Sequence, residues 1–161
     1  MRRIETELAG SLKKTLPDTY MLLQGSTLSV HDAVRFVVLT GSRGPKGGFR
    51  PDSDIDISML IDTCMLQSTK NPGELMYEVI NDTISTWTSI VEIDIAVVYD
   101  KLQYGLRCFQ ITSIKSLKCK LIKPDCFGVY KTQKGFNGFV PDIGLSIEKV
   151  YPMLQIWALK Q

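Results

Sequence analysis

The sequence has little histidine and no closely paired cysteines. It holds one histidine in 161 residues, and no two of its four cysteines form a Cys-x-x-Cys pair. Structural zinc sites are built from closely spaced cysteine and histidine ligands, and small secreted domains from denser cysteine frameworks. We therefore expect neither a zinc site nor a disulfide framework, and we interpret the cysteines as reduced thiols: Cys64, Cys108, Cys119 and Cys126.

Long apolar runs and a strong net charge are also lacking. No apolar run reaches the ~18–20 residues that a membrane-spanning helix needs, and the N-terminal segment lacks the apolar centre of a signal peptide. The net charge of +2 is too small to indicate nucleic-acid binding by itself. These features predict a cytoplasmic protein without a membrane partner, folded as a single domain over residues 1–161.

Periodic apolar residues predict alternating helices and strands. A period of about 3.6 residues indicates a helix and a period of two indicates a strand. Both kinds are interleaved here, which favours an α/β (α+β) fold with helices packed on a small mixed sheet. The expected helices cover 3–15, a segment from Pro72 through Trp87, 102–116 and 143–159; the expected strands cover 35–40, 54–61, 90–98, 120–123 and 127–130. Residues 18–33 stay unassigned, and 135–161 form a C-terminal loop and helical extension.

Two helix boundaries carry specific signals. Asn71 is a plausible N-cap, Pro72 suits the first helical position, and Glu74 completes a capping-box spacing. Pro17 and Asp18 are expected to end the first helix, because proline interrupts helical hydrogen bonding.

The main chemical feature is a set of carboxylates on strands. Asp54 and Asp56 lie two residues apart, so their side chains emerge on one side of the strand, with Ile55 on the other. Several buried carboxylates without partners would be costly, whereas divalent cations such as Mg²⁺ prefer oxygen ligands. Asp94, on the alternating strand that follows, is the expected third ligand, and Glu92 on the same face is the alternative.

A glycine-serine turn precedes these carboxylates. Gly41 allows the backbone to approach a phosphate closely, and the hydroxyl and amide groups at Ser42 can donate to phosphate oxygens. Arg43 is the expected cationic contact for a triphosphate, with Lys46 and Arg50 as further candidates.

These residues together resemble a known superfamily. The run Leu-Thr-Gly-Ser at residues 39–42, followed after eleven residues by Asp-Ile-Asp-Ile at 54–57, resembles the signature of the DNA polymerase beta-like nucleotidyltransferases. The string around Arg-Pro-Asp-Ser-Asp at 50–54 is most similar to the minimal nucleotidyltransferases. The close match covers residues 35–61, and the order of elements extends it to about residue 100. The glycine-rich loop at 44–49 and the segment from Gly135 depart from that pattern.

The resemblance implies a nucleotidyltransferase fold and a metal-dependent activity. A nucleoside monophosphate, in the favoured case AMP from ATP, is transferred to an acceptor hydroxyl, and pyrophosphate is released. By position, Asp54 and Asp56 would bind two Mg²⁺ ions, Asp94 would contact one ion and activate the acceptor, and Gly41 and Ser42 would bind the nucleotide. The acceptor stays open among a protein, an RNA and a small molecule, as does the oligomeric state.

Two other interpretations remain. The minimal nucleotidyltransferases include antitoxin partners of HEPN-domain toxins, so the chain could instead be a catalytically weak binding module that masks a HEPN-type protein. A lysine-rich stretch is expected to be a solvated face, with attraction of nucleotide or RNA phosphate as the alternative; it comprises Lys115, Lys118, Lys120, Lys123, Lys131 and Lys134. His31 is expected to be structural or exposed.

Overall fold

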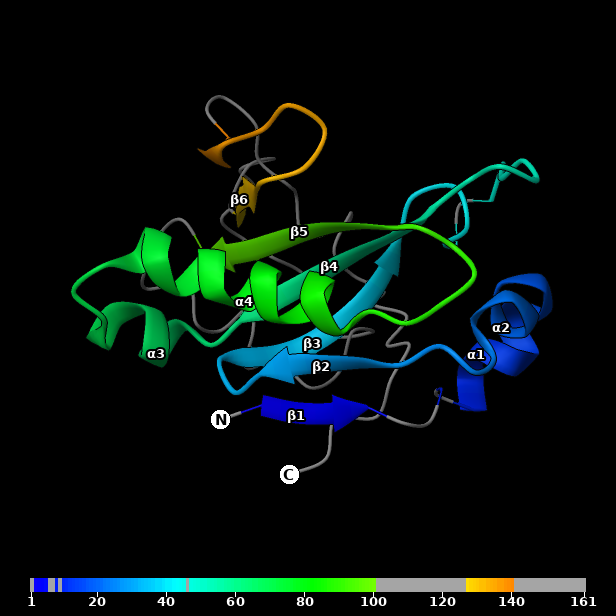
Figure 1. Ribbon diagram of the computed structural model, residues 1–161, viewed down its shortest axis with the longest axis horizontal. Helices are drawn as coiled ribbons and strands as arrows, with labels where there is room; N and C mark the ends of the chain where they lie inside the picture. Colours follow the sequence, from blue (N-terminus) through cyan, green and yellow to red (C-terminus); the bar gives the residue numbers. More distant parts are fainter. Residues whose placement is uncertain (1, 6–7, 9, 46, 101–126, 141–161) are drawn as a thin grey trace, which may run out of the picture.

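A computed structural model of the chain describes residues 2–5, 8, 10–45, 47–100 and 127–140. They form an α+β fold in which helices pack on a five-stranded mixed sheet, with a two-stranded sheet beside it (Figure 1). The expected small mixed sheet packed with helices is therefore confirmed. The elements in chain order are β1 (Arg2–Glu5), α1 (Gly10–Thr15), α2 (Pro17–Leu23), β2 (Leu28–His31), β3 (Val34–Thr40), β4 (Ile55–Ile61), α3 (Thr63–Ser68), α4 (Pro72–Thr86), β5 (Ile93–Asp100), β6 (Phe127–Lys131) and β7 (Gly138–Phe139).

The five-stranded sheet has the order β3-β4-β5-β6-β7. Only β4 and β5 run parallel, and the other neighbours pair antiparallel. The parallel pair is joined through α3 and α4, as parallel strands require a crossover connection. The beginnings of β4 and β5 therefore lie side by side, next to the end of β3.

One face of the sheet is packed against α4, which lies across it in Figure 1. The aliphatic residues of β4 and β5 on this face are fully or nearly fully buried, and they form one cluster with apolar side chains of α4. Burial of such side chains contributes about 1.5–3 kcal/mol each. The shared cluster includes Ile55, Ile57, Met59, Ile93, Ile95, Val97, Met76, Val79 and Ile80.

The expected start of α4 is confirmed. The side chain of Asn71 accepts a hydrogen bond from the backbone N–H of Glu74 at 3.1 Å, and Pro72 occupies the first turn. The cap satisfies one of the donors that a helix N-terminus leaves free.

The prediction of a helix over 3–15 is wrong at its first half. Residues Arg2–Glu5 form β1, in which Ile4 is paired with Ser29 of β2, and the helix begins at Gly10. The apolar residues at helical spacing did not reveal that this segment pairs with β2, which lies more than twenty residues further along the chain. The first helix ends at Thr15, as expected before Pro17, and Pro17 then begins α2, since proline is well tolerated in the first helical turn.

Smaller differences concern short elements. The sequence did not predict the helix α3, and β7 lies within the C-terminal loop expected to begin at residue 135, where it adds an edge strand to β6. The strand expected at 90–98 runs instead from Ile93 to Asp100. The segments expected at 102–116, 120–123 and 143–159 lie outside the described residues. Among those described, no helix has both the length and the apolar composition that a bilayer crossing requires.

Candidate metal centre

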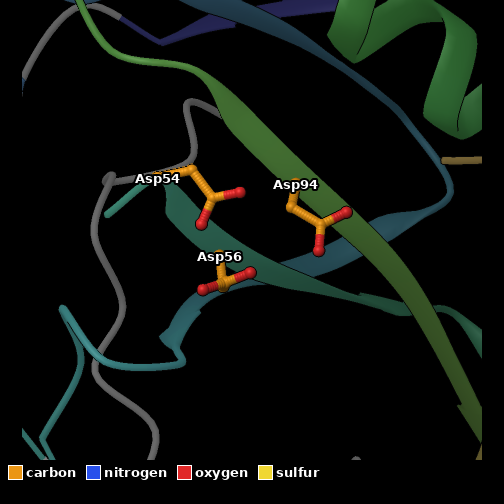
Figure 2. A group of neighbouring side chains, drawn as sticks. All are labelled: Asp54, Asp56 and Asp94. Atoms are coloured by element: carbon orange, nitrogen blue, oxygen red, sulfur yellow. The ribbon is translucent and has the colours of Figure 1, made fainter. Parts of the chain in front are cut away.

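The beginnings of β4 and β5 bring three carboxylates together. One carboxylate oxygen from each of Asp54, Asp56 and Asp94 lies within 4.8 Å of the others, and Figure 2 shows the three side chains converging from the two strands. Asp56 and Asp94 are direct partners in the parallel register. The predicted grouping of these three residues is therefore present in the structure.

The alternative third ligand, Glu92, has a different place. Its side chain is exposed, whereas Asp94 retains only 6% of its surface. The backbone carbonyl of Glu92 accepts a hydrogen bond from the N–H of Ile55 at 2.9 Å, which ties the start of β4 to the residue before β5. Glu92 thus contributes to the site through its backbone, and Asp94 through its side chain.

Burial and neighbouring charges shift the pKa values of Asp56 and Asp94 in opposite directions. Burial, then the charge of Asp54 and the proximity of Asp94, raise the pKa of Asp56 to about 6, against a smaller opposing effect of Lys134. Burial alone would also raise the pKa of Asp94. The hydrogen bond and charge of Lys131, with the charge of Lys134, outweigh burial, and the pKa of Asp94 is lowered.

Two lysines that the sequence did not connect with the carboxylates lie against them. The Nζ of Lys131 donates to Oδ2 of Asp94 at 3.0 Å, and the Nζ of Lys134 donates to Oδ2 of Asp54 at 2.8 Å. Lys134 also lies 3.5 Å from Oδ2 of Asp94. Both residues belong to the lysine-rich stretch expected to be a solvated face. That expectation is wrong for Lys131, which is largely buried against Asp94, whereas Lys134 is solvent-exposed and pairs with the carboxylates from there.

The donor set fits a divalent cation. All three side chains offer carboxylate oxygens, which hard cations prefer. Among the described residues, Oδ1 of Asp94 is a buried oxygen that accepts no hydrogen bond. Buried acceptors without partners are rare in native proteins and call for an explanation such as an ion. Asp54, Asp56 and Asp94 are the residues that would hold it.

The Gly41-Ser42 turn lies directly beside Asp56. Gly41 has a φ of +69°, and a Cβ atom added there would lie 2.7 Å from Cγ of Asp56. Glycine is therefore required both by the left-handed backbone and by the close approach of the carboxylate. The N–H of Gly44 closes the turn on the carbonyl of Gly41 at 3.0 Å. The turn and the carboxylates thus form one continuous site, with Ser42 half-buried at its rim.

Arg43, expected to contact a triphosphate, is buried and binds the chain itself. Its guanidinium donates to the backbone carbonyls of Ser53 at 2.8 Å, Arg50 at 3.1 Å and Pro51 at 3.3 Å. Its Cζ also lies 4.7 Å from the centre of the Phe49 ring. These contacts hold the loop that precedes Asp54, so Arg43 positions Asp54 through the backbone of that loop.

The remaining sequence candidates contribute little to the described site. Arg50 is exposed and lies 3.6 Å from the equally exposed Asp52. Lys46 and Lys115, Lys118, Lys120 and Lys123 lie outside the described residues. His31 is structural, as expected, since its Nδ1 accepts a hydrogen bond from the N–H of Ala33 at 3.0 Å.

Comparison with models of known protein families, with curated proteins and with solved structures finds no match to this chain. The geometry of the carboxylates, the glycine turn and the lysines therefore carries the functional argument.

Proposed function

We propose that this protein is a metal-dependent nucleotidyltransferase with the nucleotidyltransferase fold. The observation that carries the proposal is the convergence of Asp54, Asp56 and Asp94 beside the Gly41 turn, with a buried carboxylate oxygen left without a hydrogen bond. The resemblance of residues 35–61 to the polymerase beta-like signature supports the same assignment. Mg²⁺ is the proposed ion, and an NTP, favourably ATP, is the proposed nucleotide donor.

In this proposal the chain's own groups bind and orient the reactants. Asp54, Asp56 and Asp94 would hold the metal, and the N–H groups of the Gly41-Ser42 turn would donate to phosphate oxygens. When bound, Mg²⁺ neutralises phosphate charge and stabilises the attacking and leaving oxygens. Most of the rate enhancement comes from this positioning and charge neutralisation.

Asp94 is the proposed proton acceptor. Lys131 keeps its carboxylate ionised, because the pKa of Asp94 is lowered. The acceptor hydroxyl gives its proton to Asp94 while its oxygen forms a bond to the α-phosphorus. The bond from that phosphorus to the bridging oxygen breaks, and pyrophosphate leaves with the electron pair.

The test is transfer from α-labelled NTPs in the presence of Mg²⁺ to hydroxyl-bearing small molecules, RNA ends and proteins. We expect labelled product and pyrophosphate from the wild type and from Asp52→Asn, an exposed aspartate outside the cluster. Asp56→Asn should reduce transfer on the order of a hundredfold or more. Transfer that survives Asp56→Asn unchanged contradicts the metal assignment, and absence of measurable Mg²⁺ and NTP binding contradicts the function.

A second candidate function follows from the lysine contacts. The ion pairs of Lys131 and Lys134 already neutralise part of the carboxylate charge, as they would in a site retained for structure alone. The chain would then be a binding module that masks a protein such as a HEPN toxin. Tight, stoichiometric partner binding that is unaffected by Asp56→Asn, with no transfer, supports this function over the first.

A further inference from the structure

The turn that follows β6 holds two cations against the carboxylates in different ways. Lys131, the last residue of β6, has a side chain that is 18% exposed, and the side chain of its partner Asp94 is 7% exposed. Lys134 is 58% exposed, and its partner Asp54 is 25% exposed. Water therefore reaches the Lys134 pair far more readily, and a pair of this kind is weak and easily broken.

Gln133 anchors the turn to the strand that carries Asp94. Its side-chain Oε1 accepts from the N–H of Ile95 at 2.9 Å, and its Nε2 donates to the carbonyl of Ile93 at 2.9 Å. These two bonds bracket Asp94 on both sides. They continue the hydrogen bonding of β5 past the point where β6 ends, and they fix where the neighbouring lysines can reach.

Lys134 itself has an unusual backbone. Its φ is +55°, the only positive value for a residue other than glycine among those described, and Gly135 continues the turn at +86°. A left-handed residue with a long side chain costs free energy, and such strain is typical of functional segments that surrounding contacts hold in place. The strained turn directs the ammonium at two carboxylates from a solvent-exposed position.

The same carboxylates would bind both the ammonium and a divalent ion. The Nζ of Lys134 contacts Oδ2 of Asp54 and lies near Oδ2 of Asp94, which are two of the three proposed metal ligands. Bare carboxylates at this spacing repel one another, so a tethered cation stabilises the cluster before any ion arrives. A divalent ion that binds these carboxylates would therefore compete with an internal cation for them.

We propose that Lys134 is an exchangeable internal cation that holds the carboxylates in the metal-free protein and passes to the phosphates of an entering metal–nucleotide complex. A free ion displaces the ammonium without offering it a new partner, whereas the complex supplies phosphate oxygens at the same place. The site would thereby favour the metal–nucleotide complex over the free ion. The competition between the ammonium of Lys134 and a metal ion involves only the carboxylates. The movement of that ammonium to phosphate oxygens rests on the proposed function.

The first experiment measures Mn²⁺ binding without nucleotide by electron paramagnetic resonance. Lys134→Met should bind Mn²⁺ about three- to tenfold more tightly than the wild type, since an exposed ion pair no longer competes. Lys134→Arg keeps the charge and should remain within about twofold of the wild type. Lys70→Met removes an equal charge from an exposed position away from the cluster and should leave the affinity unchanged.

The second experiment measures binding of an ATP analogue with a methylene group between the α- and β-phosphorus, at saturating Mn²⁺. Lys134→Met should bind the analogue at least about threefold more weakly, because the released ammonium is missing. Tighter Mn²⁺ binding together with weaker analogue binding is the expected pair of results.

Each part has its own contrary outcome. Lys134→Met that binds Mn²⁺ no more tightly than Lys70→Met overturns the exchange, even where labelled nucleotide transfer shows the proposed function to be right. Unchanged analogue binding overturns the transfer of the ammonium to phosphate. If Lys134→Met binds Mn²⁺ more tightly but no nucleotide is transferred, the proposed function is wrong and the competition between Lys134 and the metal still holds. If no form of the protein binds Mn²⁺, the proposed function and the competition are both wrong.

Discussion

Asp56 and Asp94 face each other across the parallel pair of β4 and β5. Register partners on neighbouring strands are about 4.8 Å apart and project to the same face of the sheet. The aliphatic residues on either side of them, among them Ile55 and Ile95, are buried on the other face. A slip of one residue would bury the carboxylates and expose the isoleucines, so packing of the hydrophobic face also fixes the geometry of the candidate metal centre.

The first prediction concerns the cost of this arrangement. At pH 8 in EDTA, Asp56→Asn should raise the free energy of unfolding of the metal-free protein by about 1 kcal/mol, which corresponds to about 3 °C in Tm. The gain is no larger because solvent reaches the site and screens the charge. The folded pKa of Asp56 is about 6, above its ordinary value of 3.8. Its ionisation therefore opposes folding fully above pH 6, and this penalty fades as the pH falls from about 6 to 4.

Thermal unfolding across pH 4–8 checks this prediction. The advantage of Asp56→Asn over the wild type should be largest at pH 8 and absent at pH 4. Added Mg²⁺ should raise the Tm of the wild type but not that of the variant. Asp52→Asn, at an exposed position, is the control and should follow the wild type. An advantage that is constant with pH would mean that ionisation of Asp56 is not its source.

Sequence periodicity accounts for the placement of the three carboxylates. Alternating residues in the segments containing Asp54 and Asp94 predicted two strands with acidic faces, and the structure has both strands side by side. Such local patterns are reliable because the buried face of a strand must be continuous. The local pattern does not show the pairing of β1 with β2, which lies far along the chain, and residues 3–5 were therefore predicted as the start of a helix.

The lysine contacts could not be predicted for a related reason. Lys134 and Asp54 are eighty positions apart in the chain, and their contact depends on the end of β6 and on a positive φ at Lys134. Composition alone made the lysines look like a solvated face. The one available signal was Lys-Gly at 134–135 after an apolar strand, which indicates a turn but not what the turn faces.

The second prediction separates backbone strain from steric collision at Gly41. Gly41→Ala should destabilise the protein by about 1 kcal/mol through its positive φ, and should also weaken Mn²⁺ binding about tenfold or more by displacing Asp56. Gly25→Ala is the matched control, because Gly25 has a φ of +78° but open space around its Cβ position. It should lose similar stability and keep its Mn²⁺ affinity. Equal Mn²⁺ affinities in the two variants would contradict the steric role of Gly41.

The third prediction tests Arg43 as a positioning residue. Arg43→Lys keeps the charge but cannot donate to three carbonyls in a planar fork, so we expect a loss of about 1–3 kcal/mol in the free energy of unfolding. Metal binding should weaken as well, since the loop entering Asp54 loses its anchor. Arg50→Lys, at an exposed neighbouring position, should change neither quantity. Urea denaturation and Mn²⁺ titration of both variants provide the comparison, and unaltered stability in Arg43→Lys would rule out the anchoring role.

The last prediction concerns the side-chain amide of Gln133, which makes the two backbone hydrogen bonds beside Asp94 that a neighbouring strand would otherwise make. Gln133→Met keeps the length of the side chain but removes both hydrogen bonds to β5. The N–H of Ile95 should then exchange with solvent faster, by about five- to tenfold for a lost bond of about 1 kcal/mol. The N–H of Ile55, bonded to the carbonyl of Glu92, lies between β4 and β5, on the other side of β5 from Gln133, and should keep its protection. Amide hydrogen exchange followed by NMR resolves the two positions. Faster exchange at both positions would indicate general destabilisation. Unchanged exchange at Ile95 would show that Gln133 does not hold the strand. A change at Ile95 alone supports the inference that the two hydrogen bonds of Gln133 set the position of Asp94 and of the lysines.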